Sequence, residues 1–253
     1  MNSIGPKPDG ELPIEQEERL REIALWMFIN GESIYAVRPW VVTNENDIWF
    51  TKNKNEDTVY AFVKEKERWK YGEWKEVVLQ SVQATEQTEV SVLSQNDKVL
   101  EYQPDVIPKT TWKQAPDGLR IRSMRAQRIY NDRKWPNPVV LRITNVKPAL
   151  APPRVETVRW RWDGAQAVLE GDLKDMGKAA AVEAGFEYRS IRGLDLTERI
   201  QPWRQGPFTR RTAPGEFSLP IEGWKPGDVY EFRAVVKHPL LATYGKEVRA
   251  EVK

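Results

Sequence analysis

Hydrophobic and polar residues follow two different periods along this chain. Between Pro13 and Asn30, apolar residues return at the three- to four-residue spacing of a helix. This apolar stripe consists of Leu20, Ile23, Ala24 and Met27. We expect Gly31 to end the helix in a left-handed cap, which glycine adopts without strain. From residue 44 onward, short runs alternate with a period of two, which is typical of strands that bury one face.

The predicted strands form two groups on either side of a proline-rich segment, residues 148–153. About eight short strands fit between residues 44 and 147, and about seven fit between residues 154 and 253. The first group covers residues 47–51, 58–63, 76–79, 89–93, 99–102, 111–112, 118–122 and 139–143. The second group covers residues 155–162, 167–173, 183–190, 208–212, 216–220, 229–236 and 247–252. The prolines between the groups predict a semi-rigid, extended linker between two β-sandwich domains.

The charges of the chain nearly balance, because 39 lysines and arginines face 37 aspartates and glutamates. This balance argues against nucleic acid or an anionic membrane surface as the main partner. The chain has no cysteine, which excludes disulfides and cysteine-based metal sites. No apolar run has the length of a transmembrane helix, and the residues after Met1 do not form a signal-peptide pattern, so the location of the chain stays open.

The sequence contains no spacing typical of a metal site, a phosphate-binding loop, a nucleophile elbow or a dinucleotide-binding fingerprint. We therefore predict no catalytic, cofactor-binding or metal-binding residue in this chain. The single histidine, His238, precedes a proline near the end of a predicted strand. A surface or turn position fits that histidine better than a role as base or ligand.

The 11 tryptophans raise the question of sugar stacking. Trp69, Tyr71 and Trp74 lie in a charged loop, where exposed aromatic rings could contact sugar faces. The competing interpretation is that these rings cover a neighbouring domain. The other aromatic residues considered lie at alternating apolar positions or at a junction and are predicted to be core residues: Trp40, Trp49, Trp112, Trp160, Trp162 and Tyr230.

Two blocks near the start of the chain resemble glycoside hydrolase family 29, the α-L-fucosidases. They are Ile4-Gly5-Pro6-Lys7-Pro8-Asp9-Gly10 and Asn30-Gly31-Glu32-Ser33-Ile34-Tyr35-Ala36-Val37-Arg38-Pro39-Trp40. Ser33 stands where an alanine is usual, and Ala36 and Val37 replace a usual Gly-Thr pair. In that family the blocks flank the last helix of the catalytic (β/α)₈ barrel and lead into a C-terminal β-sandwich. The resemblance continues weakly to about residue 147.

The resemblance implies a mainly β fold with two β-sandwich domains preceded by a single-helix remnant of a (β/α)₈ barrel. Residues 1–43 would be the barrel remnant and crossing segment, 44–147 the accessory β-sandwich, and 148–153 the linker. Residues 154–253 would be a fibronectin type III- or immunoglobulin-like sandwich, because residues 224–234 resemble the fibronectin type III signature with its Pro-Gly turn. Met1 falls where the family has an apolar strand residue, so we hypothesise that the chain is truncated.

By the same resemblance, the chain is expected to be the non-catalytic C-terminal region of a retaining α-L-fucosidase-like glycoside hydrolase. The Asp nucleophile and Glu acid/base of such an enzyme belong to barrel segments, so the chain alone is expected to be inactive. In the family the helix packs on the barrel wall, so without the barrel its stripe must pack on the sandwich, pair with another copy or stay exposed.

The expected partners are fucosylated glycans, through the whole enzyme, and a barrel-containing chain, but neither nucleic acid nor a membrane. Enzymes of this family are often exported, which implies a periplasmic or extracellular location for the whole enzyme. One alternative is a free-standing carbohydrate-binding or adhesion module without catalysis. Another is a structural subunit that completes a barrel supplied by a second chain.

Overall fold

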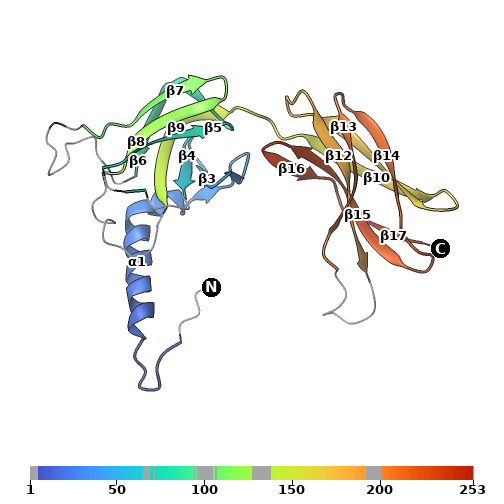
Figure 1. The fold of residues 1–253 in the computed structure, drawn as a ribbon, viewed down its shortest axis with the longest axis horizontal. Coiled ribbons are helices and arrows are strands. Elements are labelled where there is room, and N and C mark those ends of the chain that lie inside the picture. Colours follow the sequence, from blue (N-terminus) through green and yellow to red (C-terminus); the bar gives the residue numbers. More distant parts are fainter. Residues whose placement is uncertain are drawn as a thin grey trace. The chain divides into compact units, whose positions relative to one another are not determined.

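The computed structural model describes residues 5–64, 69–70, 72–93, 95, 105, 107–126, 138–191 and 201–252. The chain is mainly β, with a single α-helix and four sheets in the part described (Figure 1), which confirms the predicted fold class. It divides into two compact units, unit 1 (Met1–Ala149) and unit 2 (Leu150–Lys253). The division falls within the proline-rich segment, and the helix belongs to the same unit as the first group of strands.

The helix α1 (Ile14–Asn30) begins after Pro13, whose φ of −55° suits a helix entry. The predicted left-handed cap at its end is wrong, because Gly31 has φ −56° and ψ −32° and continues into a 3-10 turn, Gly31–Ser33. Asn30 Nδ2 donates to the Trp26 carbonyl at 3.0 Å, and Ser33 Oγ donates to the Asn30 carbonyl at 2.6 Å. Side chains thus satisfy the last helical carbonyls, so no left-handed residue is needed.

The helix docks on unit 1 through Trp26 and not through the predicted apolar stripe. The Trp26 ring stacks on Phe62 with 6.2 Å between ring centroids, and Trp26 Nε1 donates to the Pro138 carbonyl at 3.1 Å. An indole that can pack and donate a hydrogen bond at once fixes this face of the helix on the sheet. As a result Ile23 of the stripe stays 41% exposed, and Phe28 is 88% exposed.

The larger sheet of unit 1 is antiparallel and has the order β1-β3-β4-β9-β6, with β2 paired to β3. Its strands are β1 (Val37–Arg38), β2 (Asn44–Glu45), β3 (Ile48–Asn53), β4 (Val59–Val63), β6 (Val82–Val92) and β9 (Val139–Pro148). β9 comes last in the sequence of this unit but lies between β4 and β6 in the sheet. Ala61 of β4 and Leu141 of β9 pair at its centre, and both are fully buried.

The smaller sheet of unit 1 has the order β5-β8-β7. Its strands are β5 (Trp74–Leu79), β7 (Thr111–Ala115) and β8 (Gly118–Met124). Leu79, Leu119 and Ile121 are fully buried on one face, as the period of two predicts. The predicted strand at residues 99–102 lies outside the described residues.

A buried carboxylate ties the turn between β5 and β6 to the larger sheet. Glu45, 4% exposed, accepts hydrogen bonds from the backbone N–H groups of Gln80 at 2.6 Å and Ser81 at 2.7 Å. Trp40 Nε1 donates to Ser81 Oγ at 3.0 Å. Hydrogen bonds to a charged acceptor are stronger than neutral ones, so this turn is held firmly where the chain passes from one sheet to the other.

Unit 2 is a sandwich of two antiparallel sheets. One sheet has the order β10-β11-β14, and the other has the order β13-β12-β15-β16. The strand β17 also pairs with β15, at residues that β16 does not reach. The strands are β10 (Arg154–Trp162), β11 (Ala167–Asp175), β12 (Val182–Ile191), β13 (Arg204–Arg211), β14 (Gly215–Ile221), β15 (Val229–His238), β16 (Leu241–Tyr244) and β17 (Val248–Glu251). Leu169 of one sheet and Phe186 and Phe232 of the other belong to one buried cluster, so the sheets pack face to face.

Aromatic side chains form the centre of the unit 2 core. Trp224, 5% exposed, stacks on Tyr230 at 4.3 Å between ring centroids with 3° between the ring planes. Trp160 packs against Trp224 at 6.1 Å, in agreement with its predicted core role.

The prediction for Trp49 in unit 1 is wrong, because its side chain is 52% exposed on β3. β-strand alternation places a residue on one face or the other but does not say which face is covered.

The proline-rich segment lies directly against a turn of unit 2. Gly177 follows β11 with φ +64°, and a Cβ placed there would come within 2.0 Å of the Ala151 carbonyl oxygen. Only glycine fits both this backbone conformation and this close approach. The segment is thereby fixed to unit 2 at Ala151.

Cations and aromatic rings alternate on the outer face of the five-stranded sheet. The guanidinium carbons of Arg189 and Arg233 lie 4.3 and 4.2 Å from the ring centroid of Trp203. Arg233 also lies 4.1 Å from the Tyr244 ring and forms an ion pair with Glu187 at 3.0 Å. Planar guanidinium groups stack well on aromatic faces, so these side chains keep one another in place on the surface of the sheet.

Candidate functional site

The structure gives different surroundings to Trp69 and Trp74, two of the three aromatic residues predicted to contact sugar. Trp69 is 4% exposed, and its Nε1 donates to the Glu73 carbonyl at 2.8 Å. Its backbone carbonyl accepts a hydrogen bond from the Arg125 guanidinium. The Trp69 ring therefore packs inside unit 1 and offers no open face, contrary to the expectation of an exposed ring. Tyr71 lies outside the described residues.

Trp74 keeps part of its ring accessible. It begins β5, is half-buried, and has the Arg122 guanidinium 4.6 Å from its ring centroid. Lys75, the next residue, lies 5.7 Å from the Trp69 ring, and burial lowers the pKa of its ammonium group. A sugar contact stays a prediction for Trp74 and for Tyr71, whereas the buried Trp69 does not join them in an exposed cluster of three.

The more developed site in unit 1 is built on an irregularity of β6. The register of β6 with β9 jumps from the pair Ala84 and Val146 to the pair Glu89 and Thr144. Residues 85–88 therefore stand opposite Asn145 alone, which makes an extended bulge in β6. Asn145 has φ 54°, a left-handed conformation that few residues other than glycine adopt.

The bulge is held by hydrogen bonds to Asn145. The Asn145 carbonyl accepts hydrogen bonds from Thr85 Oγ1 at 2.7 Å and from Thr88 Oγ1 at 2.9 Å. The Asn145 Nδ2 donates to the Gln87 carbonyl at 2.8 Å. The Thr85 N–H also donates to Thr88 Oγ1 at 2.8 Å. Two threonines and an asparagine at these positions thus replace the ladder bonds that the bulge interrupts.

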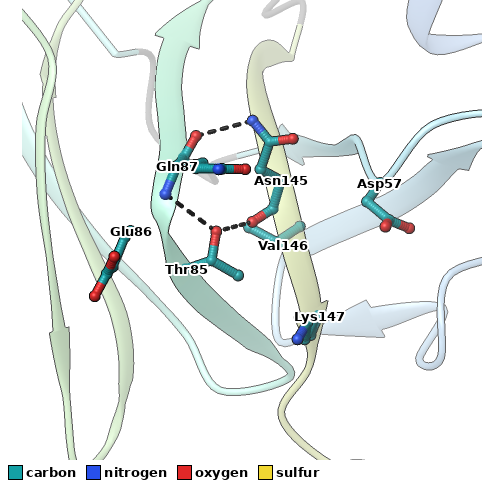
Figure 2. A pocket seen from close by; sticks show the side chains of 7 residues that line it. All are labelled: Asp57, Thr85, Glu86, Gln87, Asn145, Val146 and Lys147. Atoms are coloured by element: carbon teal, nitrogen blue, oxygen red, sulfur yellow. Dashed lines mark hydrogen bonds between the residues drawn. The ribbon is translucent and has the colours of Figure 1, made fainter.

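The bulge, β9 and the turn between β3 and β4 enclose a cleft of about 420 Å³, which we call the bulge cleft (Figure 2). The Val146 N–H donates to the Asp57 carbonyl at 3.1 Å, which ties the turn to β9. Lys52 Nζ lies 2.8 Å from Asp57 Oδ1, and this hydrogen bond holds the pKa of the Asp57 carboxyl below its usual range. The cleft is lined by Asp57, Thr85, Glu86, Gln87, Asn145, Val146 and Lys147.

A second cleft, of about 780 Å³, lies in unit 2 and is lined in part by Arg159, Glu170 and Arg211. Arg159 Nε donates to Glu170 at 2.7 Å and Arg161 Nε donates to its other oxygen at 3.2 Å. These contacts lower the pKa of Glu170 and raise the pKa of Arg159. Arg159 and Glu170 of this cleft already pair with each other, so it is the weaker candidate for ligand binding.

Neither a metal site nor a membrane helix is found in the part of the chain that the structure describes. No group of three or more potential metal-ligating side chains occurs among residues 5–252 outside the gaps given above. Over the same residues, α1 included, no helix is both long enough and apolar enough to span a membrane. The single histidine, His238, is the last residue of β15, and its Nδ1 accepts a hydrogen bond from the Leu240 N–H of the following turn at 3.2 Å.

Sequence analysis did not single out the residues of the bulge cleft. The polar run Thr85-Glu86-Gln87-Thr88 interrupts the alternation ahead of the predicted strand at 89–93, and this interruption is the signal that could locate the bulge. Asn145, which accepts hydrogen bonds from the bulge, lies 57 residues from Thr88 in the sequence. Strand pairing at that distance cannot be read from periodicity alone.

The structure thus defines a mainly β protein with a helix docked at one end of unit 1, and comparison with known proteins adds a relationship to glycoside hydrolases. No model of a known protein family matches the chain. Over 61 residues, 24% of this chain, it is 46% identical to an α-L-fucosidase of Dictyostelium discoideum, covering 13% of that protein. Over 66 residues, 25% of the chain, it is 45% identical to an α-L-fucosidase of Branchiostoma floridae, covering 14% of that protein.

A longer match extends over 97 residues, 36% of this chain, which are 35% identical to tissue α-L-fucosidase of Rattus norvegicus and cover 19% of it. These matches confirm the predicted resemblance, because the matched part of the chain is similar to a region of several α-L-fucosidases. The matched residues span between 13% and 19% of the length of these relatives. The fibronectin type III-like character of residues 154–253 stays a prediction.

Among solved structures, a β-glucuronidase of Parabacteroides merdae overlaps 78% of this chain and 28% of its own, at 10% identity and a TM-score of 0.21. A likeness of this degree carries no argument about fold or function.

Proposed function

We propose that this chain is the non-catalytic C-terminal region of a retaining α-L-fucosidase-like glycoside hydrolase. The observation that carries the proposal is the similarity to several α-L-fucosidases at up to 46% identity over a limited part of their length. The Asp and Glu that perform retaining hydrolysis would belong to a (β/α)₈ barrel, so this chain would position or stabilise that barrel.

The docking of α1 supports this role. The helix is fixed to unit 1 through Trp26, while Ile14, Ile23 and Phe28 are 59%, 41% and 88% exposed. Large apolar side chains left exposed on a helix can be covered by a partner, and here they lie on more than one side of the helix. The wall of a barrel, itself made of helices, is the partner that the fucosidase similarity suggests.

The direct test is hydrolysis of an aryl α-L-fucoside by the purified chain. We expect no turnover above a blank, because the catalytic carboxylates would lie in the barrel. Turnover by the chain alone would overturn the proposal. A second test uses a chimera in which the corresponding region of the Dictyostelium discoideum enzyme is replaced by this chain; an active chimera supports the proposal, and a folded but inactive one contradicts it.

A second candidate function is carbohydrate binding or adhesion without catalysis. The observation that favours it is the half-buried Trp74 side chain, whose ring centroid lies 4.6 Å from the Arg122 guanidinium. Fucosylated glycans would then quench tryptophan fluorescence, and Trp74→Ala would remove the quenching. If the quenching persists in Trp74→Ala, the contact predicted for this ring is excluded.

A further inference from the structure

We propose that the bulge cleft of unit 1 is a binding subsite for a neutral polyhydroxylated ligand, a mono- or oligosaccharide. The proposal goes beyond the role proposed above, because it concerns binding by this chain itself. It stands on three properties of the cleft: the irregular backbone that forms it, the hydrogen bonds that keep it in shape, and the mixture of polar groups that lines it.

The backbone of the cleft departs from regular structure at two places that meet. β6 bulges at residues 85–88, and Asn145 directly opposite adopts φ 54°. A regular strand pair would have formed more ladder hydrogen bonds and no left-handed residue, so the arrangement costs stability. Backbone outliers of this kind cluster at binding sites, and here the outlier and the cleft coincide.

The hydrogen bonds around Asn145 make the cleft rigid before any ligand arrives. Thr85 and Thr88 both donate to its carbonyl, and its side-chain amide donates to the Gln87 carbonyl. Figure 2 shows the bonds of Asn145 with Thr85 and Gln87, which join the bulge to β9, with Asp57 and Lys147 presented beside them. A site whose shape is fixed in advance loses less conformational entropy when it binds.

The lining groups suit hydroxyl groups better than an anion or an apolar ligand. The cleft offers the carboxylates of Asp57 and Glu86, the ammonium of Lys147, and the amides of Gln87 and Asn145. Each sugar hydroxyl both donates and accepts, so a neighbouring pair of hydroxyls can bond to a carboxylate and to an ammonium or amide at the same time. Asp57 already pairs with Lys52, so two carboxylates and two ammonium groups balance at the cleft and give no net attraction for an anionic ligand. The volume of about 420 Å³ falls within the range of small-molecule sites.

The test measures binding of monosaccharides to the full chain by isothermal titration calorimetry and saturation-transfer NMR. The probes are L-fucose and D-galactose, with D-glucuronate and inorganic phosphate as anionic comparators. We expect saturable binding of at least one neutral sugar with a dissociation constant in the millimolar range or tighter. Absence of saturable binding to both neutral sugars, or tighter binding of either anion, would overturn the proposal.

Matched variants locate the binding. Gln87→Ala and Lys147→Ala remove lining groups, and each is expected to weaken sugar binding at least tenfold. The controls remove a glutamine and a lysine that do not line the cleft and should leave binding unchanged. They are Gln83→Ala, on the same strand as Gln87, and Lys113→Ala on β7. Equal binding by lining and control variants would contradict the assignment. Thermal unfolding of each variant shows that it is folded.

The same experiments separate this proposal from the previous one. Hydrolysis of a fucoside by the chain would overturn the non-catalytic role without bearing on the cleft. Sugar binding that survives Trp74→Ala but is lost in Gln87→Ala assigns the ligand to the cleft, whereas the reverse pattern assigns it to the Trp74 ring and contradicts the proposal.

Discussion

The two units of this chain use tryptophan in different ways. In unit 1 the indole N–H groups of Trp26, Trp40 and Trp69 each donate a hydrogen bond that fixes a helix, a turn or a loop. In unit 2, Trp224 lies at the centre of an aromatic core, and its Nε1 has no hydrogen-bond partner among the described residues. Unit 1 is therefore held together partly by directional contacts at its margins, and unit 2 by packing at its centre.

This difference bears on what each unit can do alone. Unit 2 buries two phenylalanines completely, Phe186 and Phe232, between its own two sheets. Unit 1 leaves large apolar residues of α1 exposed, and its strand β6 departs from regular pairing. The unit that carries an exposed helix and an irregular cleft is the one in which we place both proposed interactions. The following experiments test the contrast.

The largest effect is expected from removing a core ring of unit 2. Phe186 is fully buried and lies 5.2 Å from Phe217 and 6.3 Å from Phe232 between ring centroids. Phe186→Ala should lower the free energy of unfolding of unit 2 by about 3–5 kcal/mol, from lost burial and the cavity left behind. Hydrogen exchange measured by mass spectrometry reports each unit separately.

The control for that variant is the same substitution on the open helix of unit 1. Phe28 is 88% exposed, so Phe28→Ala should change stability by no more than about 0.5 kcal/mol. Comparable losses at Phe186 and Phe28 would mean that the helix surface is covered in solution, for example by a second copy of the chain.

The next effect concerns the close approach of the proline-rich segment to unit 2. Gly177→Ala places a Cβ against the Ala151 carbonyl, whereas Gly223→Ala meets nothing within 4 Å. Both glycines have positive φ, +64° and +82°, so both variants share the backbone strain. We expect Gly177→Ala to destabilise unit 2 by roughly 1–3 kcal/mol more than Gly223→Ala in urea unfolding. Equal losses would show that the segment can move away without cost.

A smaller effect is expected at the carboxylate that anchors the turn in unit 1. Glu45→Gln keeps the shape of the side chain but replaces one charged acceptor by a donor facing a backbone N–H of Gln80 or Ser81. We expect a loss of about 1.5–3 kcal/mol confined to unit 1 in hydrogen exchange. Glu89→Gln, at an exposed position on β6, serves as the control and should have little effect. A loss that extends to unit 2 would contradict the independence of the two units.

The smallest effect is a pH dependence in unit 2. Burial lowers the pKa of His238 below its ordinary value, so the folded state favours the neutral imidazole that accepts from the Leu240 N–H. The stability from this group is therefore complete above the unfolded pKa of about 6.5 and is lost as the pH falls through the lower folded pKa. Unfolding of wild type and His238→Gln at pH 7 and pH 5 should show a slightly steeper loss in the wild type. A shallower one would mean that His238 is stabilised as imidazolium.

Much of the fold follows from local patterns, and two of the misplaced features involve a long-range contact. The period of two identifies most strands and the prolines locate the division into units, because both signals are local. The helix is predicted correctly, but its docked face is not, since Trp26 gains a hydrogen bond to Pro138 that no helical pattern reveals. Trp69 is likewise buried by contacts with Arg125, far along the chain.

The candidate site is less accessible from sequence than the fold. Recognition of the fucosidase blocks rests on two dense motifs and needs no structure. The bulge cleft depends on the pairing of Thr85 and Thr88 with Asn145, and on a turn that brings Asp57 alongside. None of these residues belongs to a motif, so their common location appears only when the strands are paired.

The central place of β9 in the larger sheet of unit 1 has a consequence for synthesis. Val59 of β4 pairs with Ile143, and Val92 of β6 pairs with Leu141. Until the last strand of the unit emerges from the ribosome, β6 therefore has no partner in this sheet and β4 is paired only with β3. Folding of such a sheet is slow, because long loops must close before the pairing repays their entropy. During that interval β4 and β6 expose strand edges that can pair wrongly. A chain that ends before residue 139 would keep those edges open, and its nascent form would depend on protection from aggregation.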